Sequence, residues 1–170
     1  AMEVGGQPLQ ECFIEKTYAS FQSIEKAAAA ISAAENPLIL VGNGAIRAQA
    51  STSLTRFATE LQIPVANTFM GKGVIPYTHP LALWAVGLQQ RDYISCGFDH
   101  TDLVIAVGYD LIEYSPKSWN PEGTIPIIHI GTTHAEIDSS YIPFAEVVGD
   151  ISDSLEEILQ RADRRNKPTP

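Results

Sequence analysis

Four carboxylates stand close behind apolar runs, where they could carry acid and base chemistry. Asp110 and Glu113 follow one such run, Asp138 follows another, and Asp150 follows a third. Two carboxylates can divide the roles of general acid and general base if the fold brings both within reach of one substrate. Spacing along the chain does not place any two of them together. Helix capping and a solvated rim therefore remain the commoner alternative for these side chains.

Two glycine-rich turns could bind phosphate through backbone amides. The Gly-Asn-Gly turn at 42–44 follows an apolar run, as a dinucleotide fingerprint would. However, Arg47 stands at the third glycine position, and Asn67 stands where an acid would hold the ribose. The Met-Gly-Lys-Gly loop at 70–73 could place amides and one cation against a phosphate, although it lacks the P-loop pattern. For both turns a structural interpretation stays open, in which glycine permits only a tight bend.

Histidine and cysteine are placed unfavourably for metal binding or nucleophilic catalysis. The four histidines are spread along the chain without the helical spacing that a zinc site prefers. Neither Cys12 nor Cys96 has a basic or histidine neighbour that would lower its pKa, and we interpret both as free thiols. His129 lies within an apolar run and is interpreted as a hydrogen-bonded core residue. We expect no catalytic residue and no metal ligand in this chain.

Short apolar runs that end in glycine alternate with amphipathic segments, which is typical of βαβ units. The runs at 38–41, 64–67, 103–107, 125–130 and 146–148 predict strands, with a weaker strand at 81–88. Helices are predicted from residue 23 to about 35, at 49–61, at 92–98 and from about 151 to 164. The predicted fold is α/β: a doubly wound, mostly parallel, Rossmann-like sheet of five or six strands with helices on both faces.

The domain boundaries and the ligand crevice follow from this fold. We expect an N-terminal arm or linker at 1–20, one domain at 21–164 and a disordered tail at 165–170. In doubly wound sheets, ligands bind beyond the carboxyl ends of the strands. The crevice is therefore predicted to be lined by Gly42, Asn43, Gly44, Thr68, Met70, Gly108, Asp110, Gly131, Thr132 and Gly149.

Charge and hydropathy narrow the classes of partner. The chain has 20 acidic and 11 basic residues, and the basic residues are scattered, which is unfavourable for binding nucleic acid. We find no window with the roughly 18 apolar residues that a membrane span requires, and no basic, apolar leader at the N-terminus. A cytoplasmic protein that contacts neither nucleic acid nor membrane is expected.

Five blocks resemble the central domain of thiamine-diphosphate enzymes, in the same order along the chain. They read NPLILVGNGAIR, LQIPVANTFMGKGVIPYTHPLAL, VGLQQRDYISCGFDHTDLVIAVGYDLIEYSPKSWN, IIHIGTTHAEID and EVVGDI. The most specific parts are the loop at 68–73, the His-Pro pair at 79–80, the strand at 102–108 and the closing Val-Val-Gly-Asp. The resemblance covers about residues 36–159.

The segment at 108–120 is more similar to catabolic acetolactate synthases, which work without flavin, than to the biosynthetic ones. The resemblance implies that a flavin-binding relative has an arginine where this chain has Asp110, and an acid where it has Gly131. An acid facing a pyrophosphate would repel it, so FAD is doubtful and no cofactor is expected in this chain.

The resemblance also implies the organisation of the intact enzyme. Thiamine diphosphate and Mg²⁺ would be bound by N- and C-terminal catalytic domains of the same polypeptide, in a homo-oligomer that condenses two pyruvates with loss of CO2. This chain would be a structural middle domain, inactive alone.

Two alternatives remain. One is a nucleotide-binding module, for FAD or ADP, of another thiamine-diphosphate-dependent 2-oxo acid decarboxylase or ligase. The other is an NAD-dependent enzyme of the sirtuin or deoxyhypusine-synthase kind. Against it, this chain lacks the zinc cysteines and the surroundings for a lysine nucleophile that such enzymes would need.

Overall fold

The computed structural model describes residues 16–87 and 95–164. Within them six strands form one sheet in the order β3-β2-β1-β4-β5-β6, and every neighbouring pair is parallel. The strands are β1 (Pro37–Val41), β2 (Val65–Asn67), β3 (Ala82–Ala85), β4 (Leu103–Val107), β5 (Ile127–Gly131) and β6 (Ala145–Val148). The predicted doubly wound α/β fold is confirmed, including the weak strand at 81–88.

The central strands are buried along their whole length. All five residues of β1 and all five of β4 are buried, because both faces of the sheet are covered. Ile39, in the middle of β1, is paired with Val65 on one side and Ile105 on the other. The edge strands β3 and β6 are only partly buried. The order of strands reverses between β1 and β4, so the turns after these two strands flank the point where such folds bind ligands.

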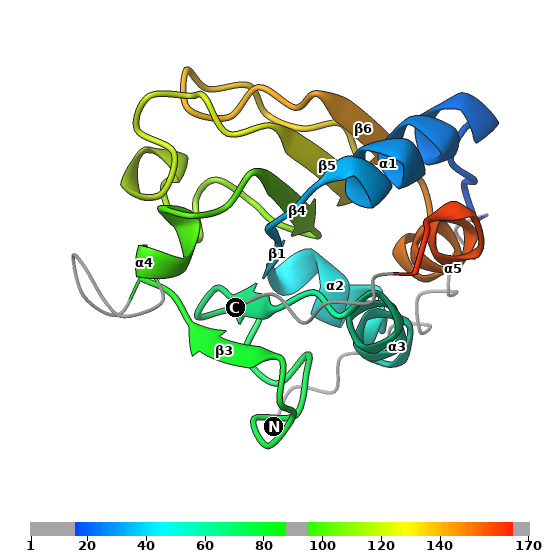
Figure 1. Ribbon diagram of the computed structural model, residues 1–170, viewed down its shortest axis with the longest axis horizontal. Helices are drawn as coiled ribbons and strands as arrows, with labels where there is room; N and C mark the ends of the chain where they lie inside the picture. Colours follow the sequence, from blue (N-terminus) through cyan, green and yellow to red (C-terminus); the bar gives the residue numbers. More distant parts are fainter. Residues whose placement is uncertain (1–15, 88–94, 165–170) are drawn as a thin grey trace, which may run out of the picture.

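Three amphipathic helices cover one face of the sheet. They are α1 (Phe21–Ala33), α3 (Ser51–Leu61) and α5 (Ile151–Arg161), and α5 packs between the other two (Figure 1). Ser20 caps α1 by accepting a hydrogen bond from the Ser23 amide at 3.1 Å. The apolar stripes of these helices and the residues of the sheet beneath them form the larger core cluster.

The opposite face is covered mainly by loops rather than by long helices. Among the described residues its helical parts are α4 (Ser95–Phe98) and a 3₁₀ turn at Pro116–Ser118 (Figure 1). A cluster of aromatic rings fills the space, with Trp119 packed 5.3 Å from Phe98 and 6.2 Å from Tyr109 between ring centroids. Rings of this size bury enough apolar area to cover the strands without a full helix.

One helix was missed at the first turn of the fold. The sequence predicts only a turn at residues 42–44, but the chain enters α2 (Asn43–Arg47) directly after β1. Gln49, in the left-handed conformation with φ of 54°, then separates α2 from α3. Residues 1–15 of the predicted arm, residues 92–94 of the predicted helix and the tail at 165–170 lie outside the described residues.

The end of the predicted arm is held by the domain. The Asp150 amide donates to the Thr17 carbonyl at 2.7 Å, and Lys16 forms ion pairs with Asp150 and Asp153 at 3.2 and 3.3 Å. A membrane-crossing helix, which must be long and apolar, is not found in the described parts of the chain.

Candidate ligand crevice at the strand ends

The carboxyl ends of β1, β4 and β5 enclose a small cavity of about 180 Å³, which we call the strand-end crevice. This volume is below the roughly 300–1,000 Å³ of typical small-molecule sites. The lining residues are Asn43, Gly44, Arg47, Gly108, Tyr109, Asp110, Glu113, His129, Gly131, Thr132, Thr133 and Ile151.

The structure brings most of the predicted crevice residues to this place. Asn43, Gly44, Gly108, Asp110, Gly131 and Thr132 line the cavity. Gly42 and Thr68 lie beside it. Met70 is instead more than half exposed, and Gly149 packs against the chain at Thr17 and Ala19.

Backbone packing accounts for the glycines of the two turns. The Gly44 amide donates to the Gly108 carbonyl at 2.8 Å, so the turns after β1 and β4 lie directly against each other. Gly108 has a φ of 55°, and a Cβ built on it would lie 2.2 Å from the Ala45 nitrogen. Close packing of the two turns therefore accounts for the glycines of the Gly-Asn-Gly segment without a bound phosphate.

The loop at 70–73 is also fixed by contacts with the rest of the domain. The Gly71 amide donates to Thr68 Oγ1 at 3.0 Å, and a Cβ at Gly71 would lie 2.6 Å from the Val41 carbonyl oxygen. The Lys72 ammonium lies 5.7 Å from the centre of the Phe69 ring. The Gly71 amide therefore points into the fold, and the phosphate-loop hypothesis loses one of the donors it needs.

Glu113 connects the ends of three strands. Its loop follows β4, and its carboxylate accepts hydrogen bonds from the Asn43 amide, after β1, at 3.0 and 3.1 Å. It also accepts one from Thr68 Oγ1, after β2, at 2.5 Å. Glu113 is one of the four candidate carboxylates, but it is not among the predicted crevice residues. Nothing in its spacing along the chain indicates these partners.

The other three carboxylates bind backbone amides of their own segments. Asp110 accepts from the Ile112 amide at 3.0 Å, and Asp138 accepts from the Ser140 amide at 2.8 Å. Asp150 caps α5 by accepting from the Asp153 amide at 3.0 Å. These contacts agree with the capping interpretation, and none of them joins two carboxylates into an acid/base pair.

His129 is a hydrogen-bonded core residue, as predicted, with 5% of its surface exposed. Its Nε2 lies 3.1 Å from the Thr133 carbonyl, which can only accept, so Nε2 carries the proton. Nδ1 then accepts from the Tyr141 hydroxyl at 2.9 Å. Burial lowers the pKa of His129, against opposing effects of Thr133 and Glu146, which favours this neutral form.

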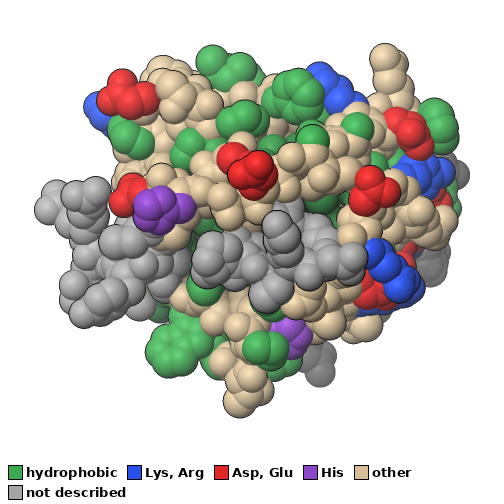
Figure 2. All heavy atoms as spheres, in the orientation of Figure 1, with side chains coloured by type: hydrophobic (Ala, Val, Ile, Leu, Met, Phe, Trp, Pro, Cys, Tyr) green, Lys and Arg blue, Asp and Glu red, His purple; other side chains and the backbone are tan. Residues whose placement is uncertain are grey.

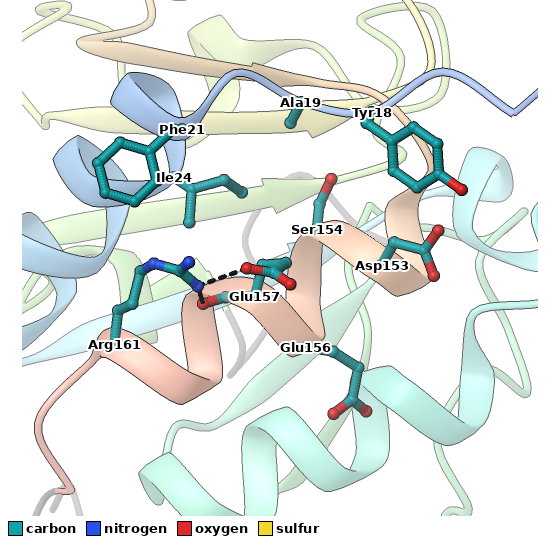
Figure 3. Close-up of a pocket in the computed structure, with 9 residues that line it drawn as sticks. All are labelled: Tyr18, Ala19, Phe21, Ile24, Asp153, Ser154, Glu156, Glu157 and Arg161. Atoms are coloured by element: carbon teal, nitrogen blue, oxygen red, sulfur yellow. Dashed lines mark hydrogen bonds and ion pairs between the residues drawn. The ribbon is translucent and has the colours of Figure 1, made fainter.

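A larger cavity, of about 470 Å³, lies between the N-terminal segment, α1 and α5 (Figure 3). Two exposed aromatic rings, Tyr18 and Phe21, stand on its rim. Its charged side chains are ion-paired: Glu157 with Arg161 at 2.5 Å, Glu156 with Arg56 at 2.8 Å and Asp153 with Lys16. This groove lies between α1 and α5, and its lining shares no residue with the strand-end crevice.

The matching family model is described as "Thiamine pyrophosphate enzyme, central domain", and it covers residues 24–158. The chain belongs to this family.

This central domain is similar to parts of several longer enzymes. It is 37% identical over 147 residues to a probable acetolactate synthase large subunit of Methanocaldococcus jannaschii, covering 85% of this chain and 24% of the relative. It is 33% identical over 150 residues to a catabolic acetolactate synthase of Raoultella terrigena, covering 87% and 26%. The central domain thus spans about a quarter of the length of these relatives.

The fold is shared more widely. Benzoylformate decarboxylase from Polynucleobacter necessarius superimposes with a TM-score of 0.73 at 21% identity, over 99% of this chain and 32% of that one. Oxalyl-CoA decarboxylase of Escherichia coli is 31% identical over 152 residues, covering 88% of this chain and 25% of the relative. Relatives with differently named reactions therefore match the same central domain.

Among the described residues, the central domain offers no grouped side chains that would hold the cation of thiamine pyrophosphate. Its diphosphate group needs a cation, and hard cations are held by several convergent oxygen ligands. In the described ranges, no three histidine, cysteine or acidic side chains are grouped to hold a metal ion. The carboxylates at the strand ends bind backbone amides and Thr68 instead.

Proposed function

We propose that this chain is the structural middle domain of an acetolactate-synthase-like enzyme of the catabolic, flavin-independent kind. In the intact polypeptide it would hold the N- and C-terminal catalytic domains at their spacing and contribute to contacts between subunits. The intact enzyme would condense two pyruvates with loss of CO2. Thiamine diphosphate and Mg²⁺ would be bound by the other domains, and this chain alone would be inactive.

One observation carries the proposal: the polar groups at the strand ends bind one another. The Glu113 carboxylate, the Asn43 amide and the Thr68 hydroxyl form a closed set, and Asp110 binds the amide of its own loop. A catalytic or cofactor site needs such groups directed toward a ligand. This arrangement supports a structural role for the domain.

Exposed apolar side chains support its attachment to further domains. Large hydrophobic residues that expose 41–89% of their surface are distributed over several elements, and Figure 2 shows hydrophobic side chains at several separate places on the visible face. Two of these side chains, Tyr77 and Trp84, lie together with ring centroids 6.1 Å apart, and exposed apolar side chains that lie together are typical of faces that pack against other protein. The exposed large hydrophobic residues are Tyr18, Phe21, Phe69, Met70, Tyr77, Trp84, Ile112, Ile137, Ile142 and Phe144.

The flavin-independent assignment is supported by the two positions at which a flavin-binding relative would differ. Asp110 lines the crevice where that relative would place a cation, and Gly131 closes β5 without an acid. An anion at the first position opposes a pyrophosphate group, and the second position offers no carboxylate for a ribose.

The test compares this chain with the longer polypeptide that contains it. With pyruvate, thiamine diphosphate and Mg²⁺, the longer polypeptide should form acetolactate, and after purification it should show no flavin absorption. The chain alone should form no acetolactate, and its unfolding temperature should not change with thiamine diphosphate and Mg²⁺. Release of CO2 without acetolactate, or bound flavin in the longer polypeptide, would contradict the proposal.

A further inference from the structure

We propose that Glu113 is an internal occupant of the strand-end crevice. Its carboxylate takes the hydrogen-bond donors that the phosphate of a nucleotide would need, and thereby it excludes nucleotides from this domain. The inference gives a structural reason for the proposed absence of flavin from this domain, and to that extent it rests on the proposed function. It concerns binding at the crevice and does not depend on which reaction the intact enzyme performs.

The position of the carboxylate is the first argument. Doubly wound sheets bind phosphate groups at the reversal of strand order, which here lies between β1 and β4. The Asn43 amide is the donor directly after β1, and both Glu113 oxygens lie within 3.1 Å of it. A carboxylate and a phosphate compete for such amides because both are anionic acceptors.

The surroundings of the carboxylate are shaped to admit it. A Cβ at Gly42 would lie 2.6 Å from the Gly108 carbonyl oxygen and 2.9 Å from Glu113 Oε1, so glycine at this position leaves room for both the neighbouring turn and the carboxylate. The Thr68 side chain is fully buried, and its hydroxyl donates to Glu113 Oε2 while accepting from the Gly71 amide. Thr68 thus fixes the carboxylate from the side of β2.

The loop that carries Glu113 is anchored at both ends. The Glu113 amide donates to the Asp110 carbonyl at 3.1 Å, which turns the chain back toward the crevice. The Tyr109 hydroxyl donates to the Tyr114 carbonyl, and the buried Tyr109 ring packs 6.2 Å from Trp119 between centroids. These contacts hold the carboxylate in place before any ligand arrives, so displacing it would also disturb the aromatic cluster.

The charge of the crevice acts in the same direction. Its lining contains the carboxylates of Asp110 and Glu113 and one cation, Arg47, while burial favours the neutral form of His129. A diphosphate would therefore meet a net negative lining as well as occupied donors.

The experiment measures binding of inorganic pyrophosphate, ADP and FAD to the 170-residue chain by calorimetry. The variants are Glu113→Ala, Glu113→Gln and the matched control Asp110→Asn, which removes one charge from the same crevice but keeps the Glu113 contacts. Wild type and Asp110→Asn should show no heat of binding. Glu113→Ala should bind pyrophosphate or ADP at least about tenfold more tightly than wild type.

A second measurement keeps the inference testable if Glu113→Ala unfolds. Hydrogen exchange of the Asn43 amide should be slow in wild type and accelerate at least about tenfold in Glu113→Gln, since the charge that holds this amide is lost. Wild-type binding of ADP or FAD as tight as that of Glu113→Ala would overturn the inference, as would an equal gain in Asp110→Asn or unchanged Asn43 exchange. Acetolactate formation enters neither measurement, so this inference and the proposed reaction can fail separately.

Discussion

The His129 ring and the Tyr141 hydroxyl meet inside the protein, with Nδ1 and the phenolic oxygen 2.9 Å apart. Both residues are buried; His129 belongs to β5, and Tyr141 lies in the loop between β5 and β6. Since His129 Nε2 donates to the Thr133 carbonyl, the ring joins β5 to the loop that follows it. The hydrogen bond therefore ties the strand end of the crevice to the aromatic cluster beneath the sheet.

Replacement of Tyr141 by phenylalanine should destabilise the domain. The ring and its packing are kept, but His129 Nδ1 loses its donor while remaining buried, which costs about 1–3 kcal/mol. Chemical denaturation of Tyr141→Phe against wild type measures the change. Tyr77→Phe, at an exposed tyrosine, is the control and should leave the free energy of unfolding unchanged. Equal stabilities of Tyr141→Phe and wild type would show that the contact contributes nothing.

The stability of the domain should fall as the pH drops below neutrality. Burial lowers the pKa of His129 in the folded state, whereas an unfolded histidine titrates near about 6.5. The unfolded chain therefore takes up a proton first, and the contribution of His129 is complete above about pH 6.5 and declines below it, toward its lowered folded pKa. Unfolding temperatures measured from about pH 7.5 to about pH 5.5 should show this decline.

The variant His129→Gln should flatten that profile, because it removes the titrating group. His100→Gln replaces an exposed histidine and should keep the wild-type slope. If both variants retain the slope, the pH dependence arises elsewhere. Glu146, whose pKa is lowered chiefly by the hydrogen bond from the Ala135 amide, would contribute only at more acidic pH.

Alanine at Gly108 should prevent normal folding or cost well over 2 kcal/mol. The left-handed backbone alone costs roughly 1–2 kcal/mol for a residue with a Cβ, and the added atom would collide with the backbone at Ala45. Gly73→Ala is the matched control, since its φ is 89° but no atom lies within 4 Å of the new Cβ. Comparable losses in the two variants would show that conformational strain, rather than the packing of the two turns, requires glycine at 108.

Removal of the cap of α5 should cost about 1 kcal/mol in Asp150→Ala. The carboxylate accepts from the Asp153 amide, and it also pairs with Lys16, whose side chain is largely exposed. Because exposed ion pairs contribute little, Asp150→Asn should retain most of the stability. Urea denaturation of both variants separates the two effects. A loss in Asp150→Asn as large as that in Asp150→Ala would assign the role to the ion pair.

The parts of the fold set by local pattern were predictable. The apolar run at Leu103–Val107 is short and is followed by glycine, which indicates a strand buried on both faces, and the periodicity of α5 predicts its apolar stripe. The strand β3 gave a weaker signal because its pairing with β2 is irregular, and Trp84 has a φ of 74°. Irregular edge strands lack the alternation on which such predictions depend.

The covering of the second face and the partners of Glu113 could not be predicted in the same way. Trp119 and Tyr141 lie in loops and meet only in the folded protein, so no period in the sequence marks them. The contact of Glu113 with Thr68 joins segments that are separated by two strands of the chain. This contact follows only from the order of the strands in the sheet. A prediction made from the residues that follow each apolar run does not include it.

The all-parallel pairing has a consequence for biosynthesis. Ile39 gains its first neighbour only when Val65 has been made, and its second only when Ile105 has been made. Segments that are far apart in the chain must therefore come together before both edges of β1 are paired, and such non-local contacts slow folding. A ribosome-bound chain that ended before β4 would leave one edge of β1 with unpaired backbone N–H and C=O groups, and such an edge favours aggregation during synthesis.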